Sequence, residues 1–323
     1  MQPRSFIQYL LITAKGLAMG AADVVPGVSG GTIAFISGIY EELIETIHKL
    51  DFKLFKVWKR EGLKIAWKQY NLSFLVALFL GIAISILSLA KVITWLLENK
   101  PVLVWSFFFG LVIASILYVG KQITVWNIKV VIAIVLAAGI AYYITLAKPI
   151  GSPESIWFLF FAGFIAIIAM ILPGISGAFI LLLLGAYQPV IGALDDLSTG
   201  LSTMDWGIIS QAVVKIGVFM LGAIVGLKAF SSVLNWLFKN HKNIILATLT
   251  GFMIGALNKI WPWKKVLEFR VSHDGDKVPF LEKSILPNAY EGEPMVLTAI
   301  LFMVIGFLTI FLLEKVANKT KTE

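Results

Sequence analysis

The chain has 323 residues, of which 59% are hydrophobic and only 14% are charged, and its mean hydropathy is +0.88. Soluble domains are about half apolar and a quarter charged, so this composition excludes an ordinary soluble protein and indicates an integral membrane protein. The net charge of +8 does not indicate nucleic acid as a partner, because the basic residues lie beside apolar segments, as they do in cytoplasmic loops. The apolar runs are long and continuous, which favours a bundle of helices.

One glycine-rich segment occurs twice. DVVPGVSGGTIAFISGIYEELI begins at Asp23, and ILPGISGAFILLLLGAYQPVI begins at Ile171. A shift of about 147 residues aligns eight identities, which apolar composition alone does not account for because they include Pro, Ser and Tyr. A duplicated, proline-broken apolar segment is typical of the midplane site of a transporter. The identities are Pro26, Gly27, Ser29, Gly30, Ile33, Gly38, Tyr40 and Ile44, and in the second copy Pro173, Gly174, Ser176, Gly177, Ile180, Gly185, Tyr187 and Ile191.

Each copy predicts a hairpin of two apolar arms meeting at the proline, over residues 5–47 and 154–193, which is either re-entrant or fully spanning. Three spans are expected after each hairpin. They cover residues 72–97, 101–119 and 126–147 after the first hairpin, and 205–232, 242–258 and 294–313 after the second.

Two segments outside these spans have a character of their own. Residues 48–70 carry seven Lys or Arg against two acids, with aromatic and aliphatic residues between them. They predict a basic amphipathic segment on the anionic cytoplasmic leaflet, an ordinary charged linker being the alternative. Residues 259–293 are balanced in charge and predict an external loop with a short strand pair around Asp274 and Gly275.

The distribution of charge predicts the orientation. The basic segment 48–70 and the basic tail are expected inside, with the acidic turn at Asp195 and Asp196 outside, so both termini are cytoplasmic. Three spans, an odd number, separate the hairpins, so the second copy is expected to be inverted. The chain is thus predicted to be an all-α polytopic membrane protein of two inverted repeats, residues 1–150 and 151–323, with facing tips.

The residues after each proline predict a small anion cradle. A proline ends one helix and suits the first turn of the next, where backbone N–H groups lack helical partners. These donors, the hydroxyls and the positive end of the helix dipole suit a phosphate, whereas tight helix crossing is the alternative reason for small residues. The predicted phosphate-binding residues are Gly27, Ser29, Gly30, Gly31, Thr32, Gly174, Ser176 and Gly177, with Pro26 and Pro173 as hinges.

Charged residues in apolar spans are the second signal, because each costs roughly 2.5–3.5 kcal/mol on insertion scales and usually faces a cavity or a partner. Lys15 and Lys215 are candidates for the headgroup, and pairing with Asp23 or a helix C-terminus is the alternative. Asp23 and Glu41 lack acidic counterparts in the second copy, so we expect a coupling or gating role there. The three histidines lack metal-ligand spacing and no nucleotide loop is present, so no metal or cofactor is expected.

DVVPGVSGGTIAFISGIYEELI, echoed by LPGISGAFILLLLGAY, resembles the signature of the polyprenyl-phosphate translocase (PopT) family of bacterial membrane proteins, and the similarity extends along the chain. The resemblance implies a flippase rather than an enzyme. It implies that the substrate is undecaprenyl phosphate, the lipid carrier of cell-wall sugars, returned to the inner leaflet of the cytoplasmic membrane. Alternating access around the two tips is expected, with protons or Na⁺ as hypothetical coupling ions and membrane lipids as partners.

Two other functions are compatible with broken hairpins. An undecaprenyl-diphosphate phosphatase also uses inverted hairpins, but hydrolysis needs an Arg clamp and an acid–base group, and neither tip has Arg or His. An ion-coupled symporter of a small anion needs a closed aqueous pocket, whereas a lipid carrier needs a groove open to the bilayer.

Overall fold

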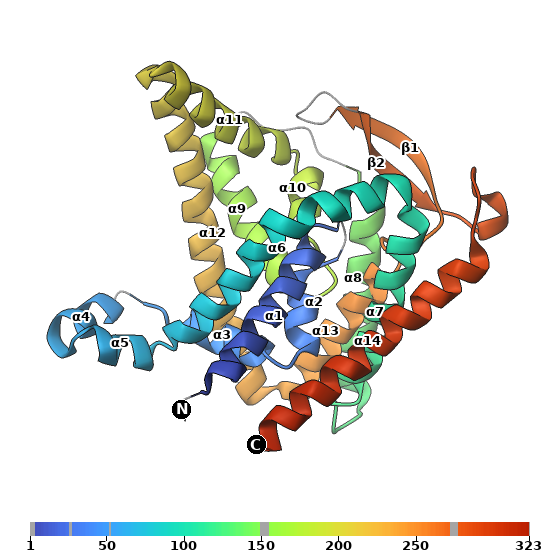
Figure 1. Cartoon of the computed structure of the whole chain (residues 1–323), viewed down its shortest axis with the longest axis horizontal. Coiled ribbons are helices and arrows are strands. Elements are labelled where there is room, and N and C mark those ends of the chain that lie inside the picture. Colours follow the sequence, from blue (N-terminus) through green and yellow to red (C-terminus); the bar gives the residue numbers. More distant parts are fainter. Residues whose placement is uncertain (1–3, 26–27, 52, 149–154, 272–276, 323) are drawn as a thin grey trace.

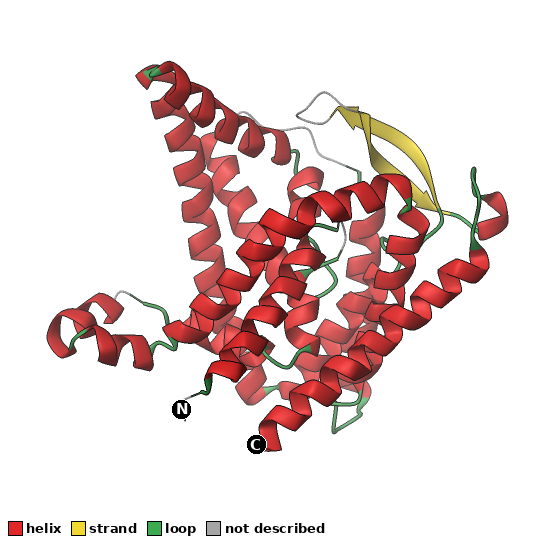
Figure 2. Cartoon of the chain, viewed as in Figure 1, coloured by secondary structure: helices red, strands yellow, loops and turns green. Residues whose placement is uncertain are grey.

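The computed structural model describes residues 4–25, 28–51, 53–148, 155–271 and 277–322. The described chain is predominantly helical, and its one pair of strands lies at the upper edge (Figure 2). This agrees with the helical membrane class that the composition predicts.

Each copy of the repeated motif forms three helices rather than two arms. In the first copy they are α1 (Phe6–Asp23), α2 (Gly30–Ile36) and α3 (Tyr40–Lys49). In the second copy they are α9 (Ile156–Ile171), α10 (Gly177–Leu183) and α11 (Tyr187–Thr203).

The second arm of each hairpin is therefore broken once more, which the sequence interpretation did not include. The break falls at Gly38 in the first copy and at Gly185 in the second, with φ of +73° and +71°. An L side chain rarely adopts this left-handed conformation, so glycine at this position ends the short helix. The bend between α10 and α11 is 105°.

The six spans expected after the hairpins all form helices. They are α6 (Leu72–Asn99), α7 (Pro101–Gly120), α8 (Ile128–Leu146), α12 (Trp206–Asn240), α13 (Lys242–Ala256) and α14 (Val296–Thr322). In the described chain four of these, α6, α7, α8 and α12, are long and apolar enough to cross a membrane, and the bent pair α10–α11 raises the number to five. At 15 residues, α13 is about 22 Å long, shorter than the hydrocarbon core.

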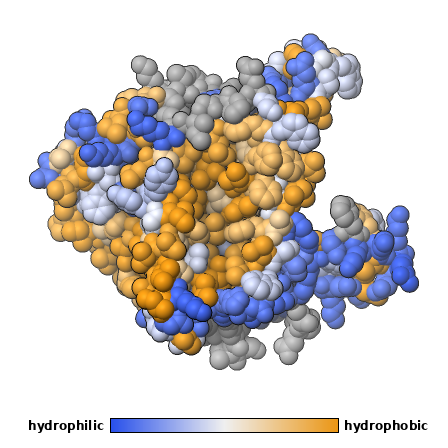
Figure 3. Space-filling model, turned by 180° about the vertical axis from the view of Figure 1, so that it is seen from behind, coloured by the Kyte–Doolittle hydropathy of each residue, from blue (hydrophilic) through white to orange (hydrophobic). Residues whose placement is uncertain are grey.

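The outer surface of the helix bundle is apolar over a broad belt. Figure 3 shows hydrophobic side chains across the middle of one face and hydrophilic residues at its upper and lower edges. Both termini lie at the lower edge, and the basic helices α4 (Lys53–Glu61) and α5 (Leu63–Gln69) project from it (Figure 1). The chain is a multi-pass membrane protein.

The strand pair expected in the loop after α13 is present. β1 (Lys264–Val271) and β2 (Lys277–Ser284) pair antiparallel, and the turn with Asp274 and Gly275 lies outside the described residues. The indole N–H of Trp261 donates to the Ile285 carbonyl at 2.8 Å, which ties the base of the hairpin to the end of α13.

Four helix pairs cross at glycines: α1 with α6, α9 with α12, α7 with α14, and α8 with α13. At each of these glycines an added Cβ would collide with a backbone carbonyl oxygen of the partner helix, so the backbones are in direct contact. The glycines are Gly16 and Gly81, Gly163 and Gly222, Gly110 and Gly306, and Gly251 and Gly255.

Candidate functional site

The broken tips of the two motif copies contact one another at the centre of the molecule. The hydroxyl of Ser29 donates to the carbonyl of Met170 at 3.0 Å, and the N–H of Gly174 donates to the hydroxyl of Thr32 at 3.0 Å. An added Cβ on Gly31 would collide with the carbonyl oxygen of Ile171. We call this set of bonds the tip contact. Its two hydrogen bonds join residues that are 141 and 142 positions apart in the sequence.

The backbone donors of the predicted cradle are occupied by the protein itself. The N–H of Gly30 donates to a carboxylate oxygen of Asp23 at 2.6 Å, and that of Gly31 donates to the hydroxyl of Ser29 at 3.1 Å. In the second copy, Ser176 accepts from the N–H of Phe179 at 3.5 Å. A carboxylate is thus already bound at the start of α2.

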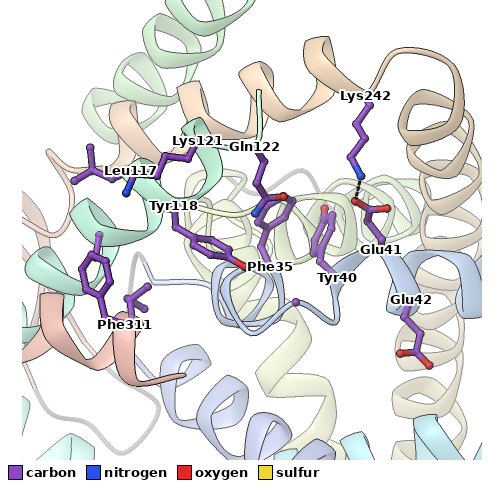
Figure 4. A pocket seen from close by; sticks show the side chains of 13 residues that line it. Phe35, Tyr40, Glu41, Glu42, Leu117, Tyr118, Lys121, Gln122, Lys242 and Phe311 are labelled. Carbon is purple, nitrogen blue, oxygen red and sulfur yellow. Dashed lines mark hydrogen bonds and ion pairs between the residues drawn. The ribbon is translucent and has the colours of Figure 1, made fainter. Parts of the chain in front are cut away.

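A cavity of about 710 Å³ lies beside the first copy of the motif, on the side of the molecule that holds the termini (Figure 4). It is enclosed by α2, α3, the end of α7, the start of α13 and the described part of α14. Its lining residues are Phe35, Gly38, Tyr40, Glu41, Glu42, Ala114, Leu117, Tyr118, Lys121, Gln122, Lys242, Ile310 and Phe311.

The acidic residues of this cavity have partners, but one of its cations does not. Glu41 pairs with Lys242 at 2.8 Å, and Glu42 holds both guanidinium nitrogens of Arg4 at 2.6 and 2.7 Å. Within the described chain the Nζ of Lys121 makes no hydrogen bond or ion pair. The cavity therefore presents one uncompensated positive charge.

Tyr40 also lines this cavity, and its hydroxyl is buried and lacks a partner within the described chain. Tyr40 is 2% exposed, and its hydroxyl has no hydrogen-bond partner among the described residues. The Glu41–Lys242 pair lies on one side of Tyr40 and Gln122 lies on the other (Figure 4). A buried donor without a partner costs about 1–3 kcal/mol, so the position favours an acceptor in the cavity. In the cavity itself, the cation of Lys121 and the amide of Gln122 suit an oxyanion.

The comparisons with known proteins identify the family. Residues 19–278 match the undecaprenyl phosphate translocase-like family, a range that includes both motif copies. The chain belongs to this family. Its family and relatives are named as transporters, so it is a transporter rather than an enzyme.

Two relatives are named polyprenyl-phosphate transporter. The protein of Vibrio cholerae serotype O1 is 43% identical over 317 residues, which are 97% of this chain and 98% of the relative. That of Staphylococcus aureus is 30% identical over 264 residues, which are 77% of this chain and 84% of the relative. No solved structure was found to match the chain.

The structure brings most, but not all, of the residues predicted for the transporter's site together. Ser29, Thr32 and Ser176 are buried at the tips, as are Gly30, Gly31, Gly177 and Pro173, while Pro26 and Gly27 lie outside the described residues. The two predicted lysines, Lys15 and Lys215, lie elsewhere.

Lys15 and Lys215 each have a different neighbour. The Nζ of Lys15 donates to the carbonyl of Ser37 at 2.7 Å, at the opposite end of α2 from Ser29. Lys215 pairs with Asp196 at 3.7 Å. Because Gly222 of α12 lies against the start of α9, Lys215 is about one helix length, roughly 24 Å, from the tip at the far end of α9.

The sequence interpretation missed Tyr40, Lys121 and Gln122 as lining residues of a site. A signal existed for Tyr40, because it is one of the eight identities shared by the two motif copies. For Lys121 and Gln122, nothing in the sequence indicates that the end of α7 faces α2.

Proposed function

We propose that the protein is a flippase that returns undecaprenyl phosphate from the outer to the inner leaflet of the bacterial cytoplasmic membrane. The observation that carries this is the cavity of about 710 Å³ that is lined by the unpartnered Lys121. The names of the family and of the two relatives support a polyprenyl phosphate as the substrate.

The physical need for such a site is plain. A phosphate alone in hydrocarbon faces a solvation cost of order tens of kcal/mol, so the headgroup needs a polar path while the tail stays in lipid. The cavity satisfies both conditions. Leu117 and Phe311 line it and are 50% and 42% exposed, so an apolar wall that suits a lipid tail stands next to the polar residues. A small soluble anion, the substrate of the symporter alternative, would not need this apolar wall.

In this proposal the two copies work as inverted repeats. α1 rises from the lower edge of the molecule and α9 descends from the upper edge, which supports the inversion (Figure 1). The lower edge, with the basic α4 and α5, would face the cytoplasm. In this proposal the tip contact closes the path between the two sides, and its parting would free the N–H of Gly174 and the hydroxyl of Ser29 for the headgroup in transit.

The test is transport by the purified full-length protein in liposomes that contain a fluorescent polyprenyl phosphate. Lys121→Gln should slow movement roughly 10-fold or more, the effect of one lost charge-assisted hydrogen bond, and Lys121→Arg should retain most of the rate. Lys129→Gln, at the exposed start of α8 outside the cavity, is the control. Wild-type protein that leaves the lipid in place would overturn the proposal.

Two further readouts address the alternatives. Release of inorganic phosphate from polyprenyl diphosphate would favour the phosphatase. Full competition by inorganic phosphate alone would favour the small-anion symporter.

A further inference from the structure

A second, much smaller cavity lies against the second copy of the motif. Its volume is about 20 Å³, and it is nearly filled by the side chains around it. They come from α10, from the end of α8, and from the hairpin and the turn before it: Phe179, Leu182, Leu183, Thr145, Ala147, Lys259, Leu281 and Glu282.

The small cavity occupies the place in the second repeat that the large cavity occupies in the first. The shift of about 147 residues carries Phe35 of the large cavity onto Leu182 of the small one. In each, the cation follows the second long helix after the hairpin: Lys121 after α7, and Lys259 after α13. The third long helix of the partner repeat also lines each, through Ile310 of α14 in one and Thr145 of α8 in the other.

The small cavity differs from the large one because a carboxylate closes it. The Nζ atoms of Lys259 and Lys264 lie 3.2 and 3.6 Å from the same oxygen, Oε2 of Glu282. The three side chains are 12%, 7% and 19% exposed. We call them the hairpin cluster. It places two lysines against one carboxylate in a largely buried position, which leaves an excess of positive charge when both lysines are protonated.

The aromatic neighbours of the hairpin cluster do not neutralise this charge. Lys264 lies 3.3 Å from the ring centroid of Trp105, and Lys259 lies 4.7 Å from that of Phe179. The Nζ of Lys264 makes no hydrogen bond within the described chain. A phosphate monoester, with about −1.5 to −2 charges at neutral pH and three acceptor oxygens, matches two lysines better than one carboxylate does.

We propose that Lys259 and Lys264 form the phosphate-binding site on the hairpin side of the molecule, and that Glu282 occupies their ammonium groups while that side is closed. This inference rests on the proposed function and assigns it a second headgroup site. When the hairpin moves away from α10, the phosphate of the lipid exchanges with the carboxylate of Glu282. The headgroup then enters next to the second tip, opposite the large cavity.

The absence of cysteine from the chain allows a direct test of opening. In a Leu183→Cys variant, a membrane-impermeant maleimide added from the hairpin side should react slowly, because Leu183 borders the closed cavity. Adding Glu282→Gln should raise the labelling rate about tenfold by weakening the closed state. Labelling that is equally slow in both variants would overturn the proposal.

Protection of the introduced cysteine from labelling identifies which compound binds in the small cavity. In the double variant, a short-chain polyprenyl phosphate should slow labelling, and a polyprenol without phosphate should not. Protection by inorganic phosphate alone would contradict a lipid headgroup site and indicate a free anion instead. Protection by the polyprenol as strongly as by the phosphate ester would overturn the assignment of the lysines.

Transport separates this inference from the proposed function. Lys259→Gln and Lys264→Gln should each slow outer-to-inner movement about tenfold. Lys265→Gln, which removes an exposed pair with Glu291 from the same strand, is the matched control. If wild-type protein transports the lipid and both lysine variants are equally fast, this inference fails and the function stands. If wild-type protein transports nothing, the function itself fails.

Discussion

The hydroxyl of Ser29 and the carbonyl oxygen of Met170 are joined by a hydrogen bond of 3.0 Å, although 141 residues separate them. With the Thr32–Gly174 bond, it closes the centre of the molecule between two cavities of very different volume. Each such bond contributes only about 1 kcal/mol net to stability. The closure is therefore weak enough to be broken and reformed during transport.

Replacing Thr32 with valine should weaken the tip contact. The shape of the side chain is kept, but the N–H of Gly174 loses its acceptor, at a cost of about 1–3 kcal/mol. The midpoint of thermal unfolding of the purified protein should fall accordingly. Thr309→Val removes an exposed bond within α14 and is the control. An equal fall in both variants would contradict a special role for Thr32.

Gly31→Ala should disrupt the tip contact by bulk rather than by a lost bond. The added methyl group meets the carbonyl of Ile171, so the two tips must separate. Gly192→Ala in α11 meets no atom within 4 Å and should stabilise its helix by up to about 1 kcal/mol. Transport measured in liposomes should fall for Gly31→Ala and should stay at the wild-type rate for Gly192→Ala. If the Gly31→Ala variant transports the lipid at the wild-type rate, the two tips need not close during transport.

Asp23 is expected to act first as an acceptor for the first N–H of α2, in addition to the N-cap residue Ser29. Its carboxylate accepts from the N–H of Gly30, and an asparagine can accept the same bond. Asp23→Asn should unfold close to the wild-type temperature, and Asp23→Ala should lose about 1–2 kcal/mol.

The same two variants test the coupling hypothesis for Asp23. If an imposed proton or Na⁺ gradient changes the transport rate of the wild type but not of Asp23→Asn, the charge is required for coupling. Rates that are indifferent to any gradient in the wild type would remove the hypothesis.

Stability should depend on pH through Lys264. Burial, partly opposed by the charge of Glu282, lowers the pKa of Lys264 from its ordinary 10.5 to about 7. Between these two values the unfolded chain binds the proton and the folded chain does not, so stability rises with pH, by at most about 1.4 kcal/mol per unit. Below pH 7 the cost of the buried charge is fully present.

The measurement is unfolding of wild-type protein and Lys264→Met between pH 6 and about 9.5. The slope attributed to Lys264 should appear in the wild type and be lost in the variant. Parallel curves would contradict the lowered pKa.

The sequence predicted the parts of the fold that depend on composition and on the repeat. Long apolar runs gave the helices, and the two prolines gave the broken tips. The strands after α13 followed from their residues and a turn signal. The breaks at Gly38 and Gly185 were missed because a glycine in an apolar helix is equally compatible with close packing.

The site depended on contacts between distant residues, which local patterns do not encode. From the sequence Lys215 is a reasonable candidate for the headgroup. The structure pairs it with Asp196 instead and places it far from the tip. Lys228 on α12 donates to the carbonyls of His48 and Leu50 at the end of α3, a contact across nearly 180 residues. The structure, unlike the sequence, shows which charges share a cavity.

The glycine crossings restrict where the molecule can change shape. Two helices in backbone contact cannot slide or roll over one another without steric collision, so each crossed pair should move as one body. In the proposed transport cycle each of the four pairs would move as a rigid body, and the short helices α2 and α10 with their glycine turns would be the hinges between them. Opening to one side of the membrane or the other would therefore change the orientation of whole helix pairs, while the contacts within each pair stay unchanged.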